Sequence, residues 1–236
     1  MQTRPRRILG TIIFLAALLL ALGLAIVAIW GDYEALSYFY TGAGYASFSG
    51  FSCPVMMSRS EVASVSARFD NPGNDEIQPY YEVDISGTAA TRHLENQMPV
   101  PAHASRTVQW TVDANDIDIG SFVMVKMDVL PVGGYSTREA TCGIVVFNLM
   151  GSSGDKVLWW TLAASLIGMV LGLGLREGKD QAIPGANMNL RNGMRAAGVA
   201  ALLAMLTGFM GWWLIGVVFC AMTILLLAIL LRIAVT

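Results

Sequence analysis

Long apolar runs occupy both ends of the chain, and short alternating patterns lie between them. Ile8–Trp30 contains 23 residues without a charge, Val157–Leu175 contains 19, and Ala196–Leu231 contains 36. A bilayer core of about 30 Å needs about 20 helical residues, so the first two runs each fit one membrane span. The third run would be about 54 Å long as a single helix. We therefore expect it to fold into a hairpin, which gives four spans in total.

Between these runs, apolar side chains recur at every second position, as is typical of strands with one buried face. The residues expected to face inward are Ala63, Val65, Ala67 and Phe69; Tyr81, Val83 and Ile85; Val108, Trp110 and Val112; and Val123, Val125, Met127 and Val129. Turn-forming stretches such as NPGN separate the strands, and ATCGIVVFNL is expected to be the last strand. The pattern predicts an antiparallel sandwich of five or six strands.

The sandwich segment resembles the immunoglobulin-like modules of bacterial surface proteins, through SVSARFDNPGN, YYEVDIS, VQWTV and VMVKMDV. The resemblance covers about a third of the chain and implies an architecture without a function. The expected fold class is membrane α + β, with four transmembrane helices and one extracytoplasmic antiparallel β-sandwich. The expected segments are a tail and first helix (1–30), an aromatic juxtamembrane linker (31–52), the sandwich (53–150), a second helix (151–175), a cytoplasmic loop (176–194) and a helical hairpin (195–236).

The charge distribution predicts an orientation in the membrane. Residues 31–156 hold 15 acidic and 7 basic side chains, whereas the rest of the chain holds 2 acidic and 8 basic ones. By the positive-inside tendency, both termini are cytoplasmic and residues 31–156 are extracytoplasmic, in a multi-pass protein of a bacterial-type plasma membrane. The first apolar run is longer than a signal-peptide core and lacks an A-x-A site, so we expect it to be a retained anchor.

Eight of the 24 residues from Trp30 to Cys53 are aromatic. An interfacial aromatic belt explains the first of them, including Trp30 and Tyr33. The aromatic residues expected to form an interaction surface further along are Phe39, Tyr45, Phe48 and Phe51. Interleaved Gly and Ser favour an irregular segment laid on another surface, which is the base of the sandwich, a partner subunit or lipid.

Two of the three cysteines, Cys53 and Cys142, bracket the predicted sandwich. Because both lie in the part expected outside the cytoplasm, we predict a disulfide between them. The third, Cys220, lies in the last apolar run and is expected to pack as a small hydrophobic residue.

Two stretches invite a metal hypothesis. His93 and His103 flank a methionine and suggest copper, but histidines in a polar stretch are ordinarily surface residues. The acidic loop Asp113–Gly120 resembles a calcium loop, yet Ile117 occupies the position of the third ligand, which favours a solvated turn. We therefore predict no metal and no cofactor, with a pigment or quinone resting on the helices left open.

The chain lacks the sequence motifs of nucleophilic hydrolases, zinc proteases and nucleotide-binding enzymes. Its apolar runs also lack ionisable residues, which disfavours transport. Ala164, Gly168 and Gly172 form a small-residue stripe that serves helix packing within the chain or between chains. The leading hypothesis is a non-enzymatic accessory or assembly subunit of a larger membrane complex, contacting lipid and other membrane subunits but no nucleic acid. The alternatives are an anchored receptor or adhesin, and a metal-dependent enzyme using His93 and His103.

Overall fold

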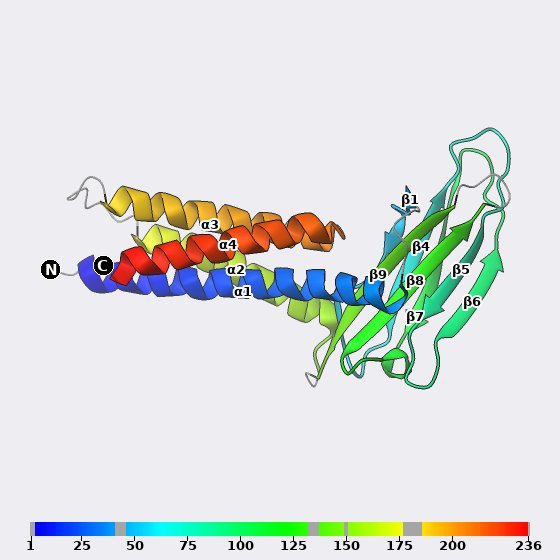
Figure 1. Cartoon of the computed structure of the whole chain (residues 1–236), viewed down its shortest axis with the longest axis horizontal. Helices are drawn as coiled ribbons and strands as arrows, with labels where there is room; N and C mark the ends of the chain where they lie inside the picture. The colour runs from blue at the N-terminus through cyan, green and yellow to red at the C-terminus, as the bar shows by residue number, and fades with distance from the viewer. Residues whose placement is uncertain (1–2, 41–45, 132–136, 149–150, 177–185, 236) are drawn as a thin grey trace. The chain divides into compact units, whose positions relative to one another are not determined.

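The computed structural model describes residues 3–40, 46–131, 137–148, 151–176 and 186–235. The chain divides into two compact units. One comprises Met1–Ile29 with Val157–Thr236, and the other comprises Trp30–Lys156. The fold is therefore a mixed one, with a helical unit and a sheet unit (Figure 1).

The helical unit consists of four helices that run alongside one another (Figure 1). They are α1 (Thr3–Tyr38), α2 (Gly154–Arg176), α3 (Ala186–Phe209) and α4 (Trp213–Val235). Within the described residues, three of them, α1, α2 and α4, are long and apolar enough to cross a membrane. The sequence predicts four such helices, whereas α3 is not among the three found. Its N-terminal half carries Arg191 and Arg195, so the uncharged part of α3 is shorter than a typical membrane span.

Helix α1 packs against the other three helices of this unit. Its residues Phe14, Leu18 and Ala25 are fully buried. A side chain at Gly172 of α2 would meet Gly10 and Phe14 of α1, and one at Gly216 of α4 would meet Ile29. The helices α3 and α4 form a tight hairpin in which Gly211 adopts a positive φ of 72°.

The sheet unit contains two sheets that enclose a common core. The smaller has the order β2-β4-β7, formed by Phe51–Ser52, Ala63–Asp70 and Ser105–Val112. The larger has the order β1-β9-β8-β5-β6, formed by Ala46–Ser47, Arg138–Phe147, Phe122–Leu130, Tyr80–Ile85 and Arg92–Gln97, and β3 (Met56–Ser58) pairs in parallel with β9. This order corresponds to the A-B-E and G-F-C-C′ strands of an immunoglobulin-like sandwich.

The core of the sandwich contains the inward-facing residues that alternation predicts. In β8, the side chains of Val123, Val125, Met127 and Val129 are fully buried. Aromatic rings from three strands and from the segment before β2 stack through this core. The centroid distances are 5.0 Å for Phe48–Phe69, 5.3 Å for Phe69–Tyr81 and 5.8 Å for Tyr81–Trp110. Burial of these apolar surfaces is the main stabilising contribution to the unit.

The structure contains the predicted disulfide between Cys53 and Cys142, with Cα atoms 6.5 Å apart. It joins the segment after β2 to β9, and Cys142 lies within the buried core. Cys220 is free and buried in α4, as its apolar surroundings predict.

The segment after Ile29 is helical, where the sequence analysis places a linker from residue 31. The helix α1 continues to Tyr38 and its last turns belong to the sheet unit. Ala35 in this part is fully buried. The glycine and aromatic residues of this segment do not indicate a helix. Packing within the sheet unit therefore stabilises the helical conformation here.

Candidate functional site on the outer face of the larger sheet

A row of four carboxylates crosses the outer face of the larger sheet. The strand register places Glu82 of β5 directly opposite Glu95 of β6 and Asp128 of β8, and Asp128 opposite Glu139 of β9. Directly opposite side chains on a sheet have Cβ atoms about 4.5–5.5 Å apart, so each carboxylate has a like charge as its neighbour. We refer to Glu95, Glu82, Asp128 and Glu139 as the acidic row.

A second row, formed by His93, Asp84 and Lys126, lies one step along the same strands. His93 Nδ1 is 2.7 Å from Asp84 Oδ1. Lys126 Nζ is 2.8 Å from Asp128 and 3.8 Å from Glu139. The two rows together hold five carboxylates against one lysine and one histidine, so this part of the face is strongly acidic.

The local environment shifts the pKa of several groups on this face. The hydrogen bond that Tyr80 donates to Glu95 raises the pKa of the phenol to about 12. Burial raises the pKa of Glu139, whose side chain is 11% exposed. The hydrogen bond to Asp84 raises the pKa of His93. Hydrogen bonding to a neighbouring carboxylate is therefore the main cause of the shifts of Tyr80 and His93, and burial is the main cause of the shift of Glu139.

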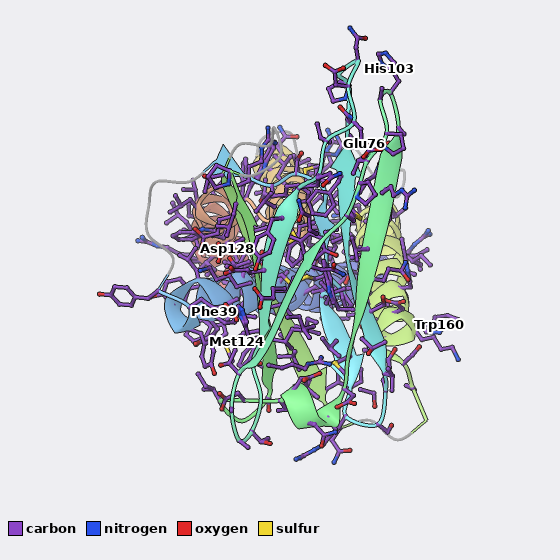
Figure 2. All side chains as sticks on the ribbon, turned by 90° about the vertical axis from the view of Figure 1, so that its right-hand side faces the viewer. Phe39, Glu76, His103, Met124, Asp128 and Trp160 are labelled. Carbon is purple, nitrogen blue, oxygen red and sulfur yellow. A yellow bond between two sulfur atoms is a disulfide. The ribbon has the colours of Figure 1, made fainter. Side chains whose placement is uncertain are left out.

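The adjoining part of the same face is covered by the end of α1. A side chain on Gly31 would lie 2.7 Å from the carbonyl oxygen of Gly143 in β9, so helix and strand touch backbone to backbone. Tyr38 donates a hydrogen bond of 2.8 Å to Asp118. Met124 of β8 pairs with Gly143 and is fully buried. Asp128 lies further along the same strand (Figure 2). The end of α1 therefore covers the part of the face around Gly143.

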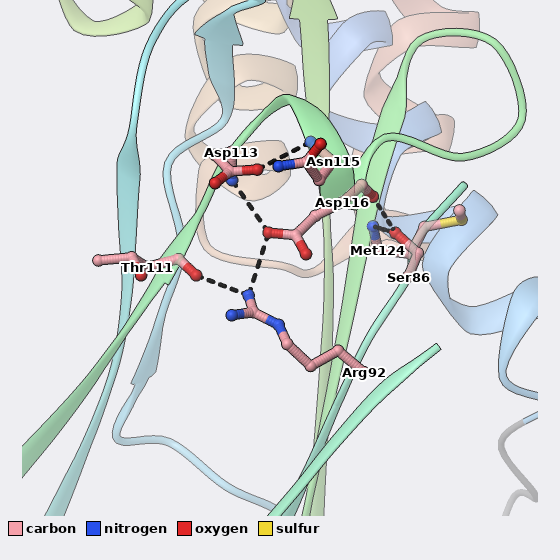
Figure 3. A network of polar contacts seen from close by, with 7 residues as sticks. All are labelled: Ser86, Arg92, Thr111, Asp113, Asn115, Asp116 and Met124. Carbon is pink, nitrogen blue, oxygen red and sulfur yellow. Dashed lines mark hydrogen bonds and ion pairs between the residues drawn. The ribbon is translucent and has the colours of Figure 1, made fainter. Parts of the chain in front are cut away.

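In the acidic loop Asp113–Gly120, the carboxylates of Asp113 and Asp116 form hydrogen bonds and an ion pair with neighbouring residues (Figure 3). Asp113 accepts a hydrogen bond from the backbone of Asn115 and caps the short 3₁₀ helix η1 (Ala114–Asp116). Asp116 is buried and pairs with Arg92 at 3.0 Å. The loop is therefore a capped turn joined to β6, in which Asp116 is buried while Ala114 and Asn115 are exposed as in the solvated turn expected from the sequence.

The four aromatic residues predicted to form an interaction surface lie in different environments. Phe48 is buried in the core against Phe69, and Phe51 packs against the same core. Phe39 makes an edge contact with Tyr38, with ring centroids 4.9 Å apart. Tyr45 lies outside the described residues. The sandwich itself is thus the surface that covers Phe48 and Phe51.

The three residues of the predicted small-residue stripe on α2 also lie in different environments. Side chains added at Gly168 and Gly172 would meet Ala17 and Phe14 of α1 at 2.7 Å, so these two glycines face α1. Ala164 is exposed, whereas its neighbour Ser165 is fully buried. The face of α2 that contacts α1 therefore includes Gly168 and Gly172, whereas Met169 lies beside Gly198 of α3.

The two histidines have separate surroundings. His103 lies in the loop before β7 and its Nε2 is 3.0 Å from Asn74. His93 lies on β6 beside Glu82 and Glu95. The potential ligand atoms of these three residues all lie within 4.8 Å of one another, so among the described residues they form a group that could hold a metal ion. The sequence analysis overlooks this group because β6 lacks apolar alternation and is not identified as a strand.

No model of a known protein family and no curated protein matches the chain. The CARDB domain of a Pyrococcus furiosus protein, solved in complex with di-metal ions, is 11% identical over 46% of this chain and 98% of that one, with a TM-score of 0.31. Red sea bream transglutaminase is 11% identical over 48% of this chain and 18% of that one, with a TM-score of 0.33. Bacteroides uniformis β-glucuronidase 2 is 10% identical over 40% of this chain and 12% of that one, with a TM-score of 0.31. These low similarities assign neither a family nor an activity.

Proposed function

We propose that the chain is a non-enzymatic accessory subunit of a membrane protein complex, which binds a basic surface of a partner through the acidic row. The observation that carries the proposal is the register of Glu95, Glu82, Asp128 and Glu139 across four adjacent strands. Like charges directly opposite one another destabilise a sheet. A surface that retains them is suited to a positively charged partner, because complementary charge steers association and fixes orientation.

The helical unit supports a membrane-anchored protein. Large apolar side chains point outward from it, including Trp160, Val170 and Leu225, which are 76%, 70% and 61% exposed. In water, an apolar surface of this extent would drive aggregation, whereas in a bilayer it faces acyl chains. These exposed apolar side chains support a multi-pass membrane protein.

The packing of α3 supports four spans, and the positive-inside tendency then puts both termini and the loop 176–194 on the cytoplasmic side. Gly198 of α3 lies beside Phe14 of α1, and Gly208 lies beside Ala28 and Ile29. The helix α3 therefore runs parallel to the central part of α1 over a similar length. If α1 crosses a bilayer, the apolar half of α3 lies at the same depth.

A pair of charge-reversal variants in the full chain tests the role of the acidic row. We expect Glu82→Lys with Asp128→Lys to abolish chemical cross-linking to the partner in native membranes. The matched control, Glu76→Lys with Asp75→Lys, changes the same charge in the loop before β5 and should leave cross-linking intact. A chain that is monomeric in native membranes, or that cross-links equally well in both double variants, would contradict the proposal.

A receptor or adhesin is the second candidate, and a surface hollow of about 460 Å³ on the sandwich favours it. The hollow is lined by Phe48, Gly50, Arg68, Asn71 and Ile77 among others, and combines apolar and polar groups. Pockets of this size accommodate small ligands. Saturable binding of a small ligand or surface polymer that Asn71→Ala removes would favour this candidate over the subunit.

A further inference from the structure

Three potential metal ligands converge at one end of the acidic row. Glu82 is on β5, and His93 and Glu95 are two positions apart on the edge strand β6, so all three project from the same face. Their ligand atoms lie within 4.8 Å of one another. Ligands around Zn²⁺ at about 2.0–2.2 Å lie about 3.3 Å apart in a tetrahedron, so an ion requires Glu82 and Glu95 to rotate inward and Glu95 to give up part of its hydrogen bond with Tyr80.

The imidazole of His93 is held in a suitable orientation by a residue outside this set. Its Nδ1 is bonded to Asp84, which leaves Nε2 as the ring nitrogen with a free lone pair when Nδ1 carries the proton. Histidine ligands of metals commonly donate their other N–H to a carboxylate in this way. Asp84 therefore occupies the place of an outer-sphere partner rather than of a ligand.

The charge of the site points in the same direction. Glu82 and Glu95 are directly opposite each other and Glu82 is also opposite Asp128, whereas Lys126 is paired with Asp128 and Glu139. Among the described residues, His93 is thus the basic side chain next to Glu82 and Glu95. A bound divalent ion would neutralise the Glu82–Glu95 pair and convert a repulsion into two favourable contacts.

We propose that Glu82, His93 and Glu95 form a binding site for a divalent transition-metal ion, with Asp84 as the positioning residue. One imidazole and two carboxylates suit Zn²⁺ and its neighbours in the first transition row, whereas Ca²⁺ takes oxygen ligands only. Three protein ligands leave a coordination position for water or for a side chain of another protein. This inference shares Glu82 and Glu95 with the acidic row of the proposed function, but its test measures metal binding and requires no partner subunit.

Zn²⁺ binding to the full chain in detergent tests the site directly, using untagged protein freed of metal with a chelator. We expect isothermal titration calorimetry in 150 mM salt to show one Zn²⁺ per chain, and His93→Ala to weaken binding at least about tenfold. Glu82→Gln and Glu95→Gln should weaken it similarly, and Asp84→Asn by about 10–100-fold. His103→Ala is the matched control and should bind as the unchanged chain does.

Two results would overturn the site. One is the absence of saturable Zn²⁺ binding by a chain whose thermal unfolding is normal. The other is Zn²⁺ binding that survives His93→Ala, or that Ca²⁺ displaces at equal concentration, since either shows general attraction of cations to the acidic row. Co²⁺ provides a second readout, because its visible absorption should change on binding and the change should be lost in His93→Ala.

Discussion

At the scale of single residues, Gly31 and Gly143 leave no room for a side chain between the last turns of α1 and strand β9. A Cβ on Gly143 would lie 1.9 Å from the carbonyl oxygen of Gly31, which is backbone and unable to move aside independently. Glycine is required here because of this close approach. The contact gives the first testable prediction.

Replacing Gly143 with alanine should destabilise the sheet unit by about 1–3 kcal/mol, because the added methyl group overpacks the contact. Gly174→Ala is the matched control, since a Cβ there meets nothing within 4 Å and alanine favours helix. Thermal unfolding in detergent, followed by circular dichroism, compares the two. Equal unfolding temperatures for the two variants would contradict the close packing.

Asp70 provides a second prediction at the same scale. Ser105 donates a hydrogen bond to its carboxylate and Arg68 lies 2.9 Å away, and together they hold the pKa of Asp70 below its usual range. A depressed carboxyl pKa stabilises the fold above the unfolded-state value near pH 4, and this contribution is lost as the pH falls through the folded-state value.

We therefore expect Ser105→Ala to lower the unfolding temperature at neutral pH. The difference from the unchanged chain should disappear as the pH falls well below about 4. Ser64→Ala, at an exposed position on the same sheet, is the control. Its effect on the unfolding temperature should be small and should not change with pH. A difference between Ser105→Ala and the unchanged chain that grew on acidification would reverse the sign and refute the argument.

At the scale of elements, the sequence predicts those strands that bury one face, and the disulfide that joins two segments of the sandwich. Val65, Val83 and Val125 lie in the core because their strands alternate apolar and polar residues. The edge strand β6 escapes prediction because only Leu94 among its six residues packs on the core. The acidic row is not predicted either. It depends on which strands pair with β6 and β9 and in which register, and the sequence of a single strand does not give this.

The C-terminal part of α1 is a second feature that the sequence does not predict. Trp30, Tyr33 and Tyr38 suggest an interfacial collar, and the expected linker begins at residue 31. In the structure, Gly31 serves a close contact inside a continuous helix. A glycine that permits close packing and a glycine that ends a helix have the same local sequence, and only the strand 112 positions later distinguishes them.

The α1–α2 contact gives a prediction at this scale. Gly172→Val should destabilise the helical unit by about 1–3 kcal/mol, because its new side chain meets Gly10 and Phe14 of α1. Ala164→Val adds two methyl groups at an exposed position on the same helix and should have little effect. Unfolding by SDS in mixed micelles measures both, and comparable losses would show that the stripe does not face α1.

At the scale of the whole molecule, the number of spans determines where the two ends of the chain lie. Single cysteines introduced at positions 2, 74, 181 and 236, in a chain carrying Cys220→Ser, distinguish the two arrangements. With four spans, a membrane-impermeant maleimide applied to intact cells labels only position 74. If α3 does not cross the membrane, position 236 is labelled as well, and the four-span proposal is wrong.

The contact between Gly31 and Gly143 also imposes an order on biosynthesis. A ribosome adding about 5–20 residues per second completes Gly143 about 6–22 s after Gly31, so the end of α1 waits that long for its strand. During this interval the helix backbone at Gly31 lacks the β9 backbone that it contacts in the folded chain. Closure of this contact therefore reports that the sandwich is complete, and a chain truncated before β9 would expose a surface on which chaperones and membrane proteases act.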